Sequence, residues 1–238
     1  MGLSRRDLIR VCAIGGTLGL TKNVGIPFPV QGSPLRKFPR VPLMFANGKP
    51  VKPQSLKVEV PYVFFYPYRS TPCFLIKLRE RVGPVSLRLE SGDIYKWQGG
   101  IGKEKTVVAF VAICTHQLSY PRRDKSFLSY YPKEKKSPLT GKDEVIQCCA
   151  HMSAFDPKSG AKPVEGPAKD PLPAVILHED TNGIYAEGVL GKDIFGEFFD
   201  LYRRELRREF GSSKKAKELV SQATVVELSD FTGNIIKC

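Results

Sequence analysis

Histidine is rare in this sequence, with three residues among 238. They are His116, His151 and His178, and the first two each stand within three residues of a cysteine. A metal centre that uses those two leaves a single histidine over. The chain therefore cannot also build a second iron site that requires two histidines and a carboxylate.

Long apolar runs are also missing. The uncharged run near the N-terminus, 11–21, has eleven residues, whereas a transmembrane helix needs about 20. The apolar stretch 24–30 could lengthen the run if Lys22 extends its ammonium group to the membrane surface. The run alone does not predict an unbroken membrane-spanning helix.

Signatures of nucleotide and nucleic-acid binding are absent too. The glycine-rich turn 99–102 is not followed by the Gly-Lys-Ser/Thr of a phosphate-binding loop. The net charge is +13, but no basic motif with interleaved aromatic residues accompanies it, so we expect no nucleic-acid partner. Such a charge is better suited to steering the protein toward anionic lipid head groups or an acidic redox partner.

What the chain does have is two short segments that pair cysteine with histidine. They are Cys114-Thr115-His116 and Cys148-Cys149-Ala150-His151. If two loops bring these side chains together, two sulfurs and two imidazoles converge on metal. This mixed set suits either a tetrahedral zinc ion or a 2Fe-2S cluster with two cysteines on one iron and two histidines on the other.

The residues after the second segment favour iron. Ser153 and Phe155-Asp156-Pro157 follow His151, and Gly166-Pro167-Ala168 comes a little later. With the two cysteine–histidine loops, this pattern resembles the Rieske iron-sulfur proteins. The type is the exported one, found in quinol-oxidising cytochrome bc complexes and as arsenite-oxidase-like small subunits. The resemblance covers roughly 57–190.

The resemblance implies one 2Fe-2S cluster per chain. Cys114 and Cys148 would hold the inner iron, and His116 and His151 the outer, solvent-facing iron. Ser153 would donate a hydrogen bond to cluster sulfur, which raises the reduction potential. Cys149 is a rival ligand, although the Cys-x-x-His spacing favours Cys148.

The sequence departs from the family pattern in three ways. Ser119 and Ala150 occupy the positions of the disulfide that joins the two cluster loops in cytochrome bc-type members, so that bond is missing. Phe155 stands where many high-potential members have tyrosine, which predicts a lower potential. Between His116 and Cys148 lie 31 residues, 117–147; this insert is either a docking surface or a solvated loop, and we favour the loop.

The function implied by the resemblance is electron transfer within an oxidoreductase complex. His151 and His116 would accept an electron and a proton from quinol, and the electron would pass to a cytochrome b/c-type subunit. An electron-transfer subunit beside the large subunit of a molybdenum oxidoreductase is the main alternative. A soluble periplasmic Rieske ferredoxin and a structural zinc protein are two others. A Rieske oxygenase is excluded, because only His178 remains for its catalytic iron.

The N-terminus predicts where this chemistry takes place. The segment 4–10, Ser-Arg-Arg-Asp-Leu-Ile-Arg, resembles a twin-arginine export signal. That route carries folded cargo, as a protein with a preassembled cluster requires. We expect 1–26 to be this signal. No Ala-x-Ala cleavage site follows it, so we favour an uncleaved membrane anchor on the periplasmic side of the inner membrane.

The rest of the chain predicts a mainly β protein, an antiparallel β-sandwich with a cluster-binding subdomain. We expect a linker over 27–54, the Rieske domain over 55–190 and a helical extension over 191–238. β-rich runs occur at 56–66, 73–78, 85–89 and 107–113, and 174–178 and 183–187 form a hairpin. An amphipathic helix begins after Gly191; we expect its aromatic face to pack on the β-domain or a partner, with a membrane-surface or nucleic-acid role as the alternative.

The six cysteines do not predict a disulfide framework. Two are assigned to the cluster, Cys149 lies beside it and Cys12 lies in the signal. A bridge between Cys73 and Cys238 is conceivable in an oxidising compartment. Because Cys73 lies in a strand-like run, we favour a buried free thiol there.

Overall fold

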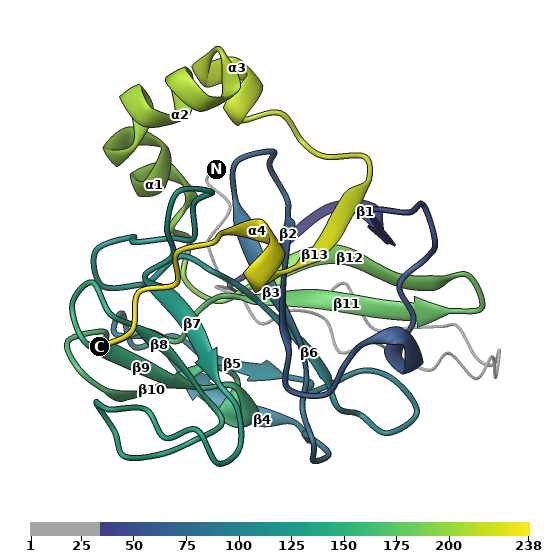
Figure 1. Ribbon diagram of the computed structural model, residues 1–238, viewed down its shortest axis with the longest axis vertical. Coiled ribbons are helices and arrows are strands. Elements are labelled where there is room, and N and C mark those ends of the chain that lie inside the picture. Colours follow the sequence, from purple (N-terminus) through teal and green to yellow (C-terminus); the bar gives the residue numbers. More distant parts are fainter. Residues whose placement is uncertain (1–33) are drawn as a thin grey trace, which may run out of the picture. The chain divides into compact units, whose positions relative to one another are not determined.

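The computed structural model describes residues 34–238, so the expected signal and the start of the expected linker lie outside the described residues. The described part is mainly β, with a few short helices, as predicted (Figure 1). Within residues 34–238, no helix is both long enough and apolar enough to cross a membrane.

The largest sheet closes on itself as a barrel. In spatial order its strands are β1 (Leu35–Phe45), β12 (Gly183–Leu190), β11 (Ala174–Asp180), β6 (Val107–Val111), β3 (Pro72–Lys77), β2 (Pro61–Phe65) and β13 (Ala223–Glu227). β1 closes the ring because it pairs antiparallel with β12 and parallel with β13. The antiparallel sandwich expected from the sequence is therefore a barrel with one parallel pair, and closure leaves it no free edge.

Strand β1 comes from the stretch expected to be a linker. From Leu35 onward this stretch is part of the barrel and not a connection leading to it. Pro39 and Pro42 concealed the strand, since proline lacks the N–H that a sheet ladder needs. The structure accommodates them with a register shift between Lys37 and Val41.

A second, four-stranded sheet carries the cysteine-rich hairpin. Its order is β10 (Lys162–Glu165), β9 (Ser153–Asp156), β8 (Val145–Cys148) and β7 (Leu128–Tyr131). A separate hairpin pairs β4 (Val85–Arg88) with β5 (Ile94–Trp97). Short 3-10 turns are η1 (Pro53–Ser55) and η2 (Pro157–Ser159).

A shared hydrophobic core joins the four-stranded sheet to the barrel. Phe74 and Phe110 from the barrel and Phe155 from β9 are fully buried in it. β6 is buried along its whole length, which explains its uninterrupted apolar sequence. Cys114 and Cys148 belong to the same core. Each stands at or just after the end of a strand, where the chain continues into a loop.

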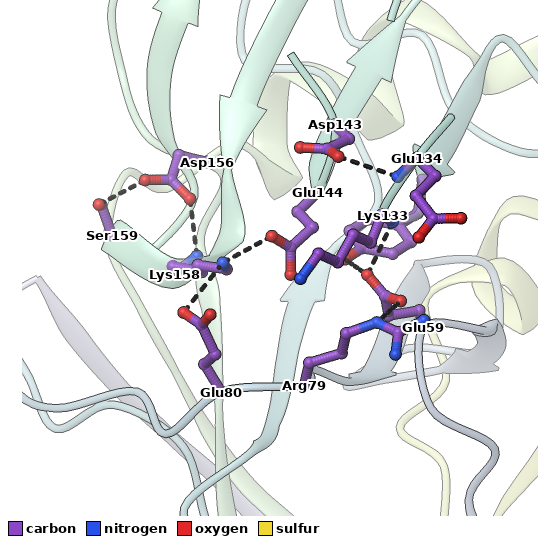
Figure 2. A network of polar contacts seen from close by, with 11 residues as sticks. Glu59, Arg79, Glu80, Lys133, Glu134, Asp143, Glu144, Asp156, Lys158 and Ser159 are labelled. Carbon is purple, nitrogen blue, oxygen red and sulfur yellow. Dashed lines mark hydrogen bonds and ion pairs between the residues drawn. The ribbon is translucent and has the colours of Figure 1, made fainter. Parts of the chain in front are cut away.

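The insert between the two cysteine–histidine segments is not a solvated loop, contrary to the interpretation we favoured. It contributes β7, and the Tyr130 ring is buried. Figure 2 shows how the buried Glu59 carboxylate anchors it: Glu59 pairs with Arg79 and accepts a hydrogen bond of 2.8 Å from the Lys133 backbone N–H. The insert's abundant lysines and arginines obscured this buried strand in the sequence.

The helices follow β12. They are α1 (Phe195–Leu201), α2 (Arg203–Phe210), α3 (Ser213–Ala216) and, after β13, α4 (Leu228–Phe231). The predicted amphipathic helix is thus two helices, with a break at Tyr202. Its aromatic face packs on the β-domain as expected: Phe198 is fully buried, and its ring centroid lies 5.0 Å from that of Tyr120.

Candidate metal centre

Two loops and a hairpin bring the four predicted ligands together. Cys114 begins a tight turn after β6, closed by a hydrogen bond of 2.9 Å from its own N–H to the Ser119 carbonyl. Cys148 is the last residue of β8 and pairs with Ser153, the first residue of β9. The second segment is therefore the connection of a β-hairpin, and His151 lies at its tip.

The two cysteine sulfurs lie side by side in the core. The Cys148 thiol donates a hydrogen bond to the Cys114 sulfur, which lowers the pKa of Cys114 to about 7. The same interaction and burial raise the pKa of Cys148. The pair therefore holds one negative charge readily and a second one only with a compensating cation, which is what a metal ion would supply.

Backbone N–H groups surround both sulfurs. Those of His116 and Gln117 point at Cys114, and those of Ala150 and His151 point at Cys148, in each case lowering the pKa of the cysteine. Such donors stabilise negative charge on sulfur. The site is thus electrostatically prepared for thiolate ligands even though burial opposes charge.

The two imidazoles form a second pair. The ring centroids of His116 and His151 are 5.2 Å apart and the ring planes are almost perpendicular. His116 Nδ1 is buried and has no hydrogen-bond partner, a costly state for a polar atom unless something else occupies that position. His151 is exposed. One imidazole is therefore turned inward at the site while the other faces solvent.

A third loop, which contains the Gly-Pro-Ala segment 166–168, packs against the hairpin tip. Gly166 has φ +83°, and a Cβ placed there would lie 1.9 Å from the Met152 carbonyl oxygen. Only glycine permits this approach. Ala168 N–H donates to the Ser153 hydroxyl over 3.3 Å, and Thr115 Oγ1 donates to the Asp170 carbonyl over 2.6 Å, so the third loop contacts both cysteine–histidine segments.

Ser153 lies beside Cys114. Its side chain is fully buried, and it forms a hydrogen bond that helps to lower the pKa of Cys114. Phe155 is also fully buried and has no hydroxyl to offer. The hydrogen bonding available to the site thus comes from Ser153 and the backbone.

Cys149 is not a rival ligand, because it forms a disulfide with Cys238 across 89 residues of sequence. The sequence predicted no disulfide framework and left open only a bridge between Cys73 and Cys238, so this bond was not predicted. Gln147 donates to both sulfurs of the bridge. Cys73 is a buried free thiol, as predicted. In the sequence Cys238 had no assigned role, but Cys149 stood as a rival ligand, so no signal paired the two.

The disulfide fastens the C-terminal tail beside the centre. Ser126 N–H donates to the Asn234 carbonyl over 2.9 Å, and Ile236 N–H donates to the Ser126 carbonyl over 2.8 Å. Cys149 N–H donates to the Phe127 carbonyl over 2.7 Å. We call the segment 232–238 the C-terminal clasp. It holds the second cysteine–histidine segment from outside, and no disulfide links that segment to the first.

The sequence did not predict the aromatic contacts of Tyr120, which follows the first cysteine–histidine segment; we call these contacts the aromatic bracket. The Tyr120 ring lies 4.9 Å from that of Tyr202, centroid to centroid, and its hydroxyl donates to the Glu205 carboxylate. Burial, then Glu205, and also the nearby Cys148 and Cys114 raise the pKa of Tyr202. The break between α1 and α2 therefore packs against Tyr120, four residues after His116.

The donor set fits a binuclear cluster. The four predicted ligands are grouped two by two: adjacent sulfurs in the core, adjacent imidazoles at the rim. Two cysteines on one iron and two histidines on the other is the arrangement that defines Rieske centres.

Comparisons with known proteins agree with this geometry. The chain is 29% identical over 142 residues to the iodate reductase subunit IdrB of Pseudomonas sp. (strain SCT), covering 58% of this chain and 57% of that protein. It is 28% identical over 145 residues to the iodate reductase subunit IdrB of Denitromonas iodatirespirans, covering 59% and 60%. The chain is a Rieske-type protein. The match spans less than two thirds of either relative.

The Rieske-type assignment also fixes the cofactor, a 2Fe-2S cluster. Among solved structures, the soluble domain of the Rieske protein II (soxF) from Sulfolobus acidocaldarius matches with 28% identity and a TM-score of 0.45, covering 64% of this chain and 78% of that one. A TM-score this low adds no weight to the assignment. No protein-family model matches the chain.

Proposed function

We propose that this Rieske-type protein is the electron-transfer subunit of a molybdenum oxidoreductase. The observation that carries the proposal is the pairing of Cys114 with Cys148 and of His116 with His151 at a loop tip. Two further points support it. The two relatives are named as subunits of a reductase, and the sequence resembles arsenite-oxidase-like small subunits.

In this proposal the buried cysteines hold the inner iron and the histidines hold the outer one. The bound cluster supplies a one-electron carrier. His116 Nδ1, buried and without a partner, is the atom that would face iron. His151 is exposed, so its imidazole edge is where an electron enters or leaves, and its outer nitrogen can exchange a proton with solvent or substrate.

Electron transfer to or from quinol in a cytochrome bc-type complex is the second candidate function. It is favoured by the exposed His151 and by its neighbour Met152, an apolar side chain that is 40% exposed. Together they offer a hydrogen-bonding nitrogen beside an apolar contact, as a quinol would need. The missing disulfide between the cluster loops weighs against this candidate.

We also propose that the protein works outside the cytoplasm, exported by the twin-arginine route and held at the periplasmic side of the inner membrane. The motif at 4–10 supports this, although it lies outside the described residues. The Cys149–Cys238 disulfide adds support, because such bonds persist in oxidising compartments.

Purification of the tagged protein from its native host tests the function. We expect a large subunit and molybdenum to copurify with the cluster, with metals measured by mass spectrometry. Copurification of haem b with no molybdenum would instead establish the quinol-oxidising complex. Recovery of the coloured protein alone would contradict both and establish a free electron carrier, and a colourless protein containing zinc would overturn the cluster.

A further inference from the structure

Helix α2 presents four arginines, three of which have no counter-ion among residues 34–238. Its four arginines line a surface hollow of about 520 Å³, together with Gly211 and Ser213. Arg203 pairs with Asp200 over 3.0 Å. Arg204, Arg207 and Arg208 make no ion pair with any residue in 34–238. We call the four arginines 203, 204, 207 and 208 the arginine face.

The acidic and apolar residues of α2 are turned the other way. Glu205 binds Arg122 over 3.1 Å and accepts the Tyr120 hydroxyl. Leu206 is only 2% exposed. Glu209 lines a different hollow, together with Arg123 and Phe210. The four arginines of α2 thus share one face, and Glu205, Leu206 and Glu209 lie on the other side of the helix.

The arginine face is braced against the metal centre. Tyr120 lies four residues after His116, and it contacts Phe198 on α1 and Tyr202 at the start of α2, with ring centroids 5.0 and 4.9 Å away. Arg122 adds the ion pair to Glu205. The same short segment of chain therefore carries a predicted cluster ligand, His116, and contacts the two helices α1 and α2.

A lipid surface is a poor occupant for this face. A helix that lies on a membrane turns an apolar side toward the lipid. In α2, Leu206 is buried and Phe210 packs against the core; the exposed Leu201 in α1 stands alone. Arginine also differs from lysine in binding carboxylates through two parallel hydrogen bonds. The chemistry of the face matches carboxylate groups on a protein.

We propose that the arginine face is a docking surface for an acidic patch on the protein that exchanges electrons with the cluster. It would bring that partner to the side of the centre bounded by Tyr120 and Tyr202. Only the partner's identity as a molybdenum subunit rests on the proposed function; the charge and its position do not.

Stopped-flow oxidation of the reduced holoprotein by ferricyanide tests the position of this charge. Ferricyanide takes one electron from the reduced cluster and is a trianion, so arginines beside the centre should attract it. We expect the triple variant R204Q/R207Q/R208Q to react about tenfold more slowly than wild type at low salt, with a flatter dependence on ionic strength.

A control variant loses the same charge elsewhere. Lys49, Lys52 and Lys103 lie around η1, and Figure 1 shows η1 and α2 at opposite sides of the molecule. All three are exposed. K49Q/K52Q/K103Q should change the rate less than twofold. Equal slowing of both variants would mean that total charge acts, and no slowing of either would mean that the face is remote from the cluster; both results overturn the proposal.

The partner is tested by copurification from the native host. We expect R204Q/R207Q/R208Q to keep its visible spectrum and to recover much less of the acidic partner than the lysine variant does. If the arginine variant reacts more slowly with ferricyanide than wild type does while wild type copurifies with a partner that contains no molybdenum, the docking surface stands and the proposed function fails. Binding of wild type, but not of the arginine variant, to phosphatidylglycerol vesicles with unchanged partner recovery would reassign the face to lipid.

Discussion

At the scale of single residues, the centre depends on atoms with few substitutes. Both sulfurs are buried among backbone N–H donors, and one imidazole nitrogen is buried without a partner. Each feature is unfavourable in an empty pocket and favourable around a positively charged cluster. Substitutions here should therefore act on the cluster before they act on the fold.

Replacing His151 with alanine should abolish the cluster. The outer iron loses one of its two imidazoles, and the exposed position of His151 gives water access to the vacant coordination site. The visible spectrum and the iron content of the purified protein measure this. His178→Ala is the matched control, because His178 lies on β11, and it should retain both. A native spectrum in His151→Ala would refute the ligand assignment.

Replacing Ser153 with alanine should lower the reduction potential while leaving the cluster in place. One hydrogen bond to sulfur is lost, and a net value of about 0.5–1.5 kcal/mol corresponds to roughly 20–65 mV for one electron. Ser159→Ala removes a hydroxyl that binds Asp156 and should leave the potential unchanged. Equal potentials for Ser153→Ala and wild type would show that the hydroxyl does not contact the cluster.

At the scale of elements, three loops and the C-terminal clasp hold the centre. The first segment is braced by Tyr120 against the helices, the second is a β-hairpin tied to Cys238, and the third contacts both. Cytochrome bc-type Rieske proteins link their two cluster loops directly with a disulfide. Here the bracing comes from outside the loops.

Adding a side chain at Gly166 should displace the third loop from the hairpin tip. Gly166→Ala combines an unfavourable φ of +83° with a clash against the Met152 carbonyl, and we expect destabilisation by more than about 2 kcal/mol together with loss of cluster. Gly211→Ala has nearly the same φ, +82°, and no atom within 4 Å. Thermal unfolding followed by visible absorption separates the two. Equal destabilisation of the two variants would mean that Gly166 does not lie close to the Met152 carbonyl.

Breaking the clasp should destabilise the fold and hasten cluster loss. The Cys149–Cys238 bond spans 89 residues, and removing a bridge of this span typically costs about 2–5 kcal/mol. Cys238→Ser should therefore lower the midpoint of thermal unfolding. Treating wild type with reductant should lower its midpoint to that of the variant, which itself should not respond. A variant as stable as untreated wild type would contradict this role.

The elements differ in how much of them the sequence reveals. β6 was predicted because a strand buried on both faces is apolar throughout. Strand β1 was missed because Pro39 and Pro42 interrupt its pattern, and β7 because its buried Tyr130 sits within a lysine-rich insert. The Cys149–Cys238 bond has no local signal at all, since its partners meet only after the tail returns to Ser126.

At the scale of the whole molecule, the two cysteine–histidine segments that the structure brings together were visible in the sequence, while their surroundings were not. Cysteine–histidine pairs at fixed spacing indicate a metal centre directly, because a Rieske cluster is held by cysteine sulfurs and histidine nitrogens. The bracket around Tyr120 and the arginine face depend on how α2 packs, and that depends on tertiary contacts with the insert. Closure of the barrel likewise required β1 to reach both β12 and β13.

The fold also shows where the side chains behind the net charge of +13 lie. Much of it is paired or spread over the surface, but on α2 four arginines lie together around one hollow. Charge concentrated in this way accelerates encounters with an acidic partner and loses its effect as salt screens it. The molecule thus combines a buried cysteine pair, an exposed imidazole and an arginine-rich helix.

Film voltammetry of the purified protein across pH tests the central claim most directly. A Rieske cluster with an exposed histidine ligand should give a one-electron wave well above the roughly −400 mV of plant-type ferredoxins. The potential should fall as rising pH deprotonates the imidazoles of the oxidised protein, because reduction then takes up a proton. A low wave that does not move with pH, or no wave at all, would contradict the cysteine–histidine cluster.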